Sequence, residues 1–160
     1  MKRFIISAIV VINLFFYFNV YALDIKLLSL RDKIFLESNQ IKQEIRPDTQ
    51  DFVLLSALFD SCIQVVTQID AYFYMLGIFE YIRKEDLNKS CFNFLLSWLD
   101  VMKKTNDINL KNLTTNTFAI IEDKTKSHIE NIKTYFTELG KQIVHEKNRM
   151  NILMRSLRIR

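Results

Sequence analysis

Apolar residues recur along most of the chain at intervals of three and four, the spacing of one face of an α-helix. The helices that this spacing predicts span residues 24–45, 49–83, 86–104 and 117–157. Glycine and proline, which form turns and interrupt helices, occur only three times in 160 residues. Few long elements joined by short connections predict an all-α, four-helix-bundle-like domain of long antiparallel helices.

The first two predicted helices differ in how much of their surface is apolar. One face of the first carries its apolar residues: Leu27, Leu30, Ile34, Ile41 and Ile45. Pro47 follows and ends it, because proline disfavours helical geometry in the preceding residue. The second carries two seven-residue series, Leu55, Cys62, Ile69 and Leu76, and Leu58, Val65, Tyr72 and Phe79. Further apolar residues widen this stripe, so we expect its neighbours to enclose this helix at the centre of the fold.

The third predicted helix is shorter and the fourth is the longest. In the third helix, the side chains expected to face the core are Leu87, Cys91, Phe94, Trp98 and Met102. We expect it to end at Lys104, because residues 106–116 are rich in Asn, Asp and Thr and indicate a loop. The fourth repeats apolar residues every seven positions, as in coiled coils: Ile129, Phe136, Ile143, Met150 and Leu157. Its second series is interrupted by Glu146.

The N-terminus has the three parts of an export signal. Lys2 and Arg3 are followed by an apolar run over residues 4–18, and Ala22 ends a triplet that signal peptidases accept. The sequence therefore predicts a signal peptide over 1–22, cleaved after Ala22, and a mature domain over 23–160 that is periplasmic or secreted. No cysteine lies at the cleavage point, so a lipoprotein is excluded. The alternative is an inner-membrane anchor over residues 4–22, since a spanning helix needs about 20 residues.

Charge changes the view of partners once the signal is removed. The whole chain has 22 basic and 18 acidic residues, and removal of Lys2 and Arg3 lowers the net charge from +4 to +2. A nearly balanced domain gives no indication of nucleic-acid binding, despite a pI near 9. Apolar residues make up 49% of the chain, enough for a folded core.

Two cysteines in an exported chain raise the question of a disulfide. If the second and third helices form a hairpin near residue 85, Cys62 and Cys91 lie roughly 25 Å apart along the bundle axis. A disulfide needs Cα atoms about 6 Å apart. We therefore expect two separate buried thiols; a bridge would require the turn to fall near Gly77.

No motif predicts a catalytic, cofactor-binding or metal-binding site. His145 and Glu146 begin like the zinc-protease pattern His-Glu-x-x-His, but Arg149 stands where the second ligand belongs. His128 lies 17 residues from His145 on one predicted helix, too far to share a metal, and both histidines are expected to be solvated. A helical enzyme would have to assemble its site from scattered residues such as Glu80, Asp100, His128, Glu130 and His145.

The C-terminus is basic and partly apolar. From residue 147 onward there is no acid, and the five basic residues are Lys147, Arg149, Arg155, Arg158 and Arg160. They indicate either contact with anionic membrane or an acidic partner, or simply the basic last turns of a packed helix. The leading hypothesis is an exported, non-catalytic binding protein whose partner is a protein or an envelope surface. The alternatives are peripheral membrane attachment through this segment, self-association through the C-terminal helix, and an unrecognised helical enzyme.

Overall fold

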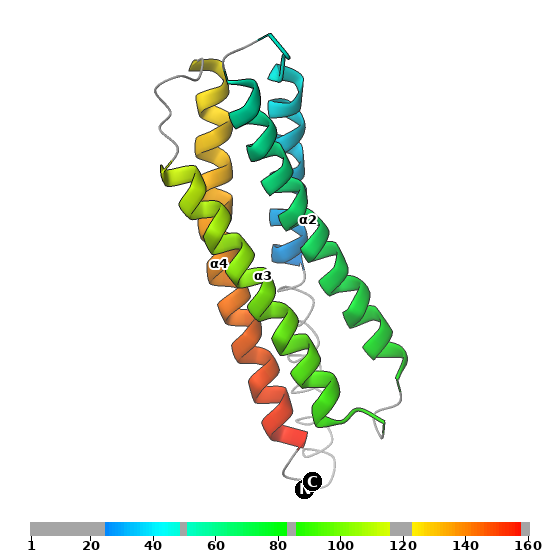
Figure 1. Cartoon of the computed structure of the whole chain (residues 1–160). Helices are drawn as coiled ribbons and strands as arrows, with labels where there is room; N and C mark the ends of the chain where they lie inside the picture. Colours follow the sequence, from blue (N-terminus) through cyan, green and yellow to red (C-terminus); the bar gives the residue numbers. More distant parts are fainter. Residues whose placement is uncertain (1–24, 49–50, 83–85, 116–122, 158–160) are drawn as a thin grey trace, which may run out of the picture.

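Four helices make up the computed structural model, which describes residues 25–48, 51–82, 86–115 and 123–157. A first helix over residues 25–44 is followed by α2 (Phe52–Tyr81), α3 (Lys89–Thr115) and α4 (Asp123–Leu157). The helices alternate in direction, and the described ranges contain no strand (Figure 1). The prediction of an all-α four-helix bundle is therefore confirmed. The predicted signal peptide over 1–22 lies outside the described residues.

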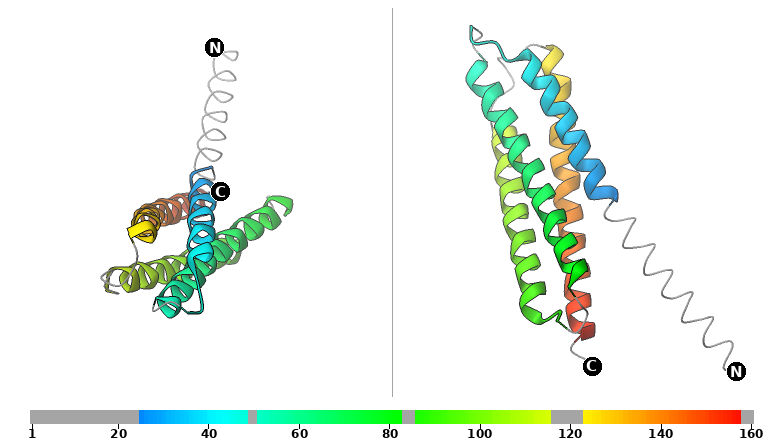
Figure 2. Two further views of the ribbon diagram at one scale, coloured as in Figure 1. Left: turned by 90° about the horizontal axis from the view of Figure 1, so that it is seen from above. Right: turned by 90° about the vertical axis from the view of Figure 1, so that its right-hand side faces the viewer.

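Each helix lies between two neighbours, and interhelical bonds show the order. Arg31 of the first helix forms a two-pronged ion pair with Asp70 of α2, with N–O distances of 2.9 Å. Glu37 of the same helix contacts α4, while α3 packs against both α2 and α4. The first helix and α3 are therefore diagonal to each other, and so are α2 and α4 (Figure 2).

Buried residues follow the predicted three-and-four spacing in three of the helices. The first helix buries Leu27, Leu30, Ile34, Ser38 and Ile41. The second buries Leu55, Leu58, Cys62, Val65, Val66, Ile69 and Tyr72. In α4 the buried positions are Thr125, Ile129, Ile132, Phe136, Leu139, Ile143, Glu146 and Met150. These seams form one continuous core.

The third helix departs from the prediction at its end and in its inward face. It continues through Thr115, so the expected end at Lys104 is wrong. Its buried residues are Leu95, Leu99, Met102, Asn106, Asn109 and Leu113, a seam that includes two asparagines. The Asn-rich stretch is helical because these amides face the core and donate hydrogen bonds to backbone carbonyls of α4 and α2. Phe94, expected to face inward, is 51% exposed.

The last part of α2 also departs from the prediction. Tyr72 is its last buried residue, and residues 73–81, here called the α2 tip, are apolar except for Glu80 but half-buried or exposed. The expectation that its neighbours enclose α2 is therefore wrong for this part of the helix. The reason is that the described first helix is too short to cover the tip. Arg31 is level with Asp70, and the two helices are antiparallel. Residue 25 is then roughly level with residue 76 of α2, and the described chain offers no fourth helix beyond it (Figure 1).

Candidate functional site

A buried polar cluster crosses the core diagonally just before the α2 tip. The Tyr72 hydroxyl donates a 2.7 Å hydrogen bond to Glu146 Oε1, and both residues are fully buried. Arg149, one turn further along α4, donates from Nε and from its terminal nitrogen to the same carboxylate. A buried carboxylate is tolerated only when it is paired and hydrogen-bonded, and this cluster meets that need.

The cluster explains two irregularities in the sequence. Glu146 interrupts the apolar series of α4, and Arg149 stands where a zinc-protease motif needs its second histidine. In the fold, Glu146 takes the inward position and Arg149 neutralises it. The separation of 74 residues between Tyr72 and Glu146 leaves no local signal by which sequence could find the pair.

His128 lies at the contact between the first helix and α4. Its Nδ1 is 2.6 Å from Glu37 Oε2, and Asn131 Nδ2 donates to the other oxygen of that carboxylate at 2.9 Å. The expectation of a solvated histidine is therefore wrong for His128, whose side chain is 26% exposed. His145, by contrast, is exposed. Within the described ranges, no three His, Cys, Asp or Glu side chains are grouped so as to hold a metal ion.

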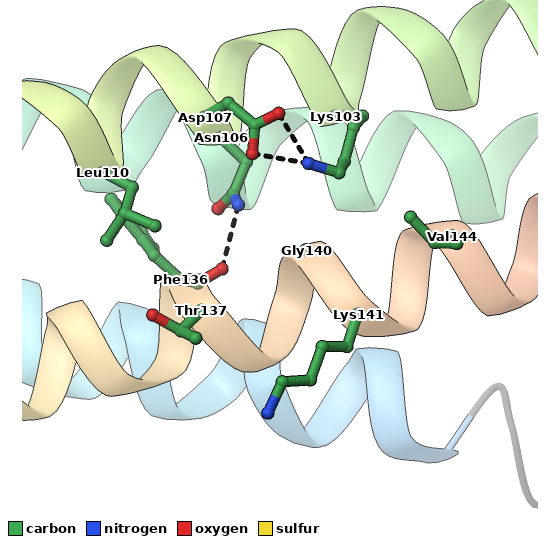
Figure 3. Close-up of a pocket in the computed structure, with 9 residues that line it drawn as sticks. All are labelled: Lys103, Asn106, Asp107, Leu110, Phe136, Thr137, Gly140, Lys141 and Val144. Atoms are coloured by element: carbon green, nitrogen blue, oxygen red, sulfur yellow. Dashed lines mark hydrogen bonds and ion pairs between the residues drawn. The ribbon is translucent and has the colours of Figure 1, made fainter.

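A groove of about 470 Å³ lies between α3 and α4 (Figure 3). Its lining consists of Lys103, Asn106, Asp107, Leu110, Phe136, Thr137, Gly140, Lys141 and Val144. Asn106 Nδ2 donates to the Phe136 carbonyl at 2.9 Å, while its buried Oδ1 has no partner within the described structure. Lys103 and Asp107 form an ion pair on the rim at 2.5 Å. The groove thus offers one buried acceptor, the ion pair of Lys103 with Asp107, and Lys141, which lies 3.6 Å from Glu138.

The residues that a helical enzyme could have used are spread over the molecule. Asp100 pairs with Lys147 at 2.5 Å, and Glu130 lies 3.7 Å from Lys133. Glu80 is exposed on the α2 tip, far along the bundle from His128 near the start of α4. None of the five candidate residues lines the groove. The described structure therefore does not bring them together.

The basic residues of the C-terminus divide into two groups. Lys147 and Arg149 have acidic partners within the chain, Asp100 and Glu146. Arg155, in the last turn of α4, is exposed. Arg158 and Arg160 lie outside the described residues. Met150 is buried and Leu153 is half-buried against the core, so the apolar seam of α4 is used within the bundle that far.

Both cysteines carry free thiols, at different heights of the bundle. Cys62 is buried, and desolvation raises the pKa of its thiol to about 12. Its neighbour Ser61 accepts a hydrogen bond from Asn109, which lies 18 positions after Cys91 on α3. At about 1.5 Å per residue, roughly 27 Å separates the two cysteines along the axis. Cys91 is half-buried, not buried as expected.

A group of uncovered apolar side chains lies on the α2 tip, and another lies on the first helix, at Ile25, Leu28, Phe35 and Leu36. Tyr74, Ile78 and Tyr81 are 73%, 46% and 93% exposed. Their spacing of four and three residues places them on one helical face, and Asp70, one turn earlier, shows that this is the face that the first helix covers. By length and composition α2 is the one described helix that could cross a membrane. Its buried seam accounts for the apolar character of residues 55–72. Within the tip, Phe73, Met75, Leu76 and Phe79 are partly buried against the core, and only the exposed stripe is left without such packing.

These features define an all-α, antiparallel four-helix bundle with one continuous core and an uncovered apolar stripe at one end. No protein-family model matches the sequence, and neither a curated protein nor a solved structure matches the chain. The site is therefore interpreted from its own residues.

Proposed function

We propose that the protein is an exported, non-catalytic binding protein of the bacterial envelope or of the secreted fraction, and that it binds through the α2 tip. The observation that carries this proposal is the stripe of Tyr74, Ile78 and Tyr81, which continues a covered helix face into solvent. Contiguous exposed apolar surface marks interaction sites on otherwise well-packed proteins, and tyrosine is enriched at such sites. The signal peptide that the sequence predicts over 1–22 supports the proposed location.

Site-specific photo-crosslinking tests this proposal in the exporting cell. A photoreactive amino acid replaces Tyr81 in one variant and Val53 in the matched control, because Val53 is 76% exposed at the other end of the same helix. We expect the photoreactive residue at position 81 to form crosslinked adducts with a protein or lipid of the cell, and the one at position 53 to form none. Equal adducts from both positions, or none from position 81, would contradict the proposal. Intact mass of the exported product tests cleavage after Ala22.

A second candidate function is peripheral membrane attachment through residues 147–160. The exposed Arg155, with no acid after Glu146 in the sequence, favours it. Self-association through α4 is the remaining alternative. It would have to use residues after Met150, since the earlier seam is buried within the bundle.

A further inference from the structure

We infer that the groove between α3 and α4 is a binding site for a small, uncharged, apolar molecule that carries a hydrogen-bond donor, either a hydroxyl or an N–H group. All residues that line the groove belong to α3 or α4, so this site is separate from the α2 tip. The inference goes beyond the proposed function and does not depend on it.

The need for a donor follows from the Asn106 side chain. Asn106 is fully buried, and its Nδ2 donates a 2.9 Å hydrogen bond to the Phe136 carbonyl. This bond fixes the orientation of the amide, so Oδ1 is left between α3 and α4 with no partner in the described structure (Figure 3). A buried acceptor without a hydrogen bond costs free energy, and a ligand that donates to it removes that cost.

The donor reaches this acceptor past Leu110. The Asn106 Oδ1 atom is shielded from water in the unliganded protein. Leu110 lies one turn after Asn106 on α3, lines the same groove and is only half-buried. A change of rotamer at Leu110, a fast motion for a side chain at the surface, opens the amide to the ligand.

Gly140 keeps the floor of the groove open beside the same amide. A Cβ at this position would lie 3.5 Å from Asn106 Nδ2 and 3.9 Å from Lys103 Nζ, which are ordinary van der Waals distances. Alanine would therefore fit, and it would favour the helix, because glycine in a helix interior is destabilising relative to alanine. Packing of α3 on α4 does not require this glycine, whereas an open groove floor does.

The size and the walls of the groove indicate a small apolar ligand. Its volume of about 470 Å³ lies within the range of small-molecule sites, about 300–1,000 Å³. Leu110, Phe136 and Val144 supply apolar walls, and Val144 is 47% exposed, so a ligand that covers it removes apolar surface from water.

The charges around the groove favour an uncharged ligand. The charged residues that line it are Lys103, Asp107 and Lys141. Lys103 is paired with Asp107 at 2.5 Å, and Lys141 lies 3.6 Å from Glu138. A charged ligand would compete with these partners and lose its own hydration, whereas an uncharged ligand leaves both pairs intact.

Titration of the purified protein with three naphthalene derivatives tests the inference. Naphthol has apolar rings and a hydroxyl donor, its methyl ether has the same rings without the donor, and naphthalene sulfonate is an anion. Chemical shifts of isotope-labelled protein locate the bound probe and give its dissociation constant.

Two variants and one control accompany the titration. Gly140→Leu fills the groove floor, and Gly77→Leu is its matched control, because a Cβ at Gly77 meets no atom within 4 Å and α2 does not line the groove. Asn106→Leu removes the acceptor at similar side-chain size. Thermal unfolding of each variant confirms that it remains folded.

We expect naphthol to bind the wild type with a dissociation constant of about 0.1–1 mM and to shift the backbone amide signals of Asn106 and Gly140. The methyl ether should bind about tenfold more weakly, and the sulfonate no more tightly than the ether. Gly140→Leu should weaken naphthol binding by about tenfold or more, with Gly77→Leu unchanged. Asn106→Leu should bind naphthol and its ether equally, a change that a loss of stability would not produce.

No saturable binding of naphthol by the folded wild type overturns the inference. Equal binding of naphthol and its ether by the wild type, or tighter binding of the sulfonate, overturns the assigned ligand chemistry. If Asn106→Leu does not fold, Gly140→Leu still decides, because unchanged naphthol binding by this variant overturns the site. Crosslinking from position 81 is independent of these results, so failure of this inference leaves the proposed function standing, and the reverse also holds.

Discussion

At the end of the bundle where α2 begins, side chains from four helices meet, and Ile41, Leu55, Leu113 and Ile129 are all buried there. At the opposite end the described first helix is absent, because it begins at residue 25, roughly level with residue 76 of α2, and the described chain provides only α2, α3 and α4 there. We call the first region the closed end. Residues of α2 are equally apolar at both ends, so the difference in burial comes from the number of neighbours and not from composition.

The polar cluster of Tyr72, Glu146 and Arg149 lies where the two regions join. It is the last level at which α2 contributes a buried side chain. Beyond it, Tyr74, Ile78 and Tyr81 are exposed and gain little from the fold.

The largest contrast between the two ends should be seen in thiol chemistry. Cys62 lies on the closed side of the polar cluster, and burial raises its pKa to about 12. A raised pKa keeps the thiol protonated at neutral and mildly alkaline pH, and only the thiolate reacts with alkylating agents. In native protein at pH 8, iodoacetamide should modify Cys91 and leave Cys62 unmodified, as read by intact mass. Denaturant should expose both. A disulfide between them, with no free thiol in either state, would contradict the described fold.

Core truncation should distinguish the two ends by stability. Phe136 is fully buried on the closed side, and Phe136→Ala should lower the free energy of unfolding by about 3–5 kcal/mol. Tyr81→Ser on the α2 tip should change it by no more than about 0.5 kcal/mol. Urea unfolding followed by circular dichroism measures both values. A loss from Tyr81→Ser comparable to that from Phe136→Ala would mean that the tip is packed.

The polar cluster between the two ends should lose stability when the Glu146 carboxylate is removed. Glu146→Ala leaves the buried Tyr72 hydroxyl and the half-buried Arg149 without this partner, so we expect a loss of about 2–3 kcal/mol. Tyr72→Phe removes one hydrogen bond and should cost about 1 kcal/mol. Glu130→Ala, at an exposed carboxylate of the same helix, is the control. Equal effects of Glu146→Ala and Glu130→Ala would show that the cluster does not form.

The smallest effect should come from Gly77 in the α2 tip. A Cβ added there meets no atom within 4 Å, so alanine fits without strain. Gly77→Ala should therefore raise the free energy of unfolding by about 0.5–1 kcal/mol, the helix propensity that glycine lacks. The same urea unfolding experiment measures this gain. Destabilisation would show that another segment covers this face of α2 in the folded chain.

Much of the fold could be predicted from the sequence, because the seams of three helices repeat at helical spacing. Leu27, Ile34, Ile69 and Phe136 are buried as that spacing requires. The continuation of α3 could not be predicted, since an asparagine looks like a loop residue until its partner is known. Asn106 donates to a carbonyl 30 residues away on another helix.

The candidate site was less accessible to sequence reasoning than the fold. Exposure of Tyr74 and Tyr81 depends on where the first helix begins relative to α2, a relation set by the pairing of Arg31 with Asp70. An apolar helix segment alone favours burial. The basic C-terminus was visible in the sequence, but the partners of Lys147 and Arg149 were not.

Hydrogen exchange along α2, read by mass spectrometry on the purified protein alone, tests most directly whether α2 is packed at one end of the bundle and uncovered at the other. Amides of residues 55–72 lie in the packed seam, whereas the α2 tip has no fully buried side chain and only partial packing of Phe73, Met75, Leu76 and Phe79 against the core. We predict that the backbone amides of residues 55–72 exchange only when the whole protein unfolds. The amides of residues 73–81 should exchange much faster. Equal protection of both segments would contradict the uncovered tip on which the proposed binding function rests.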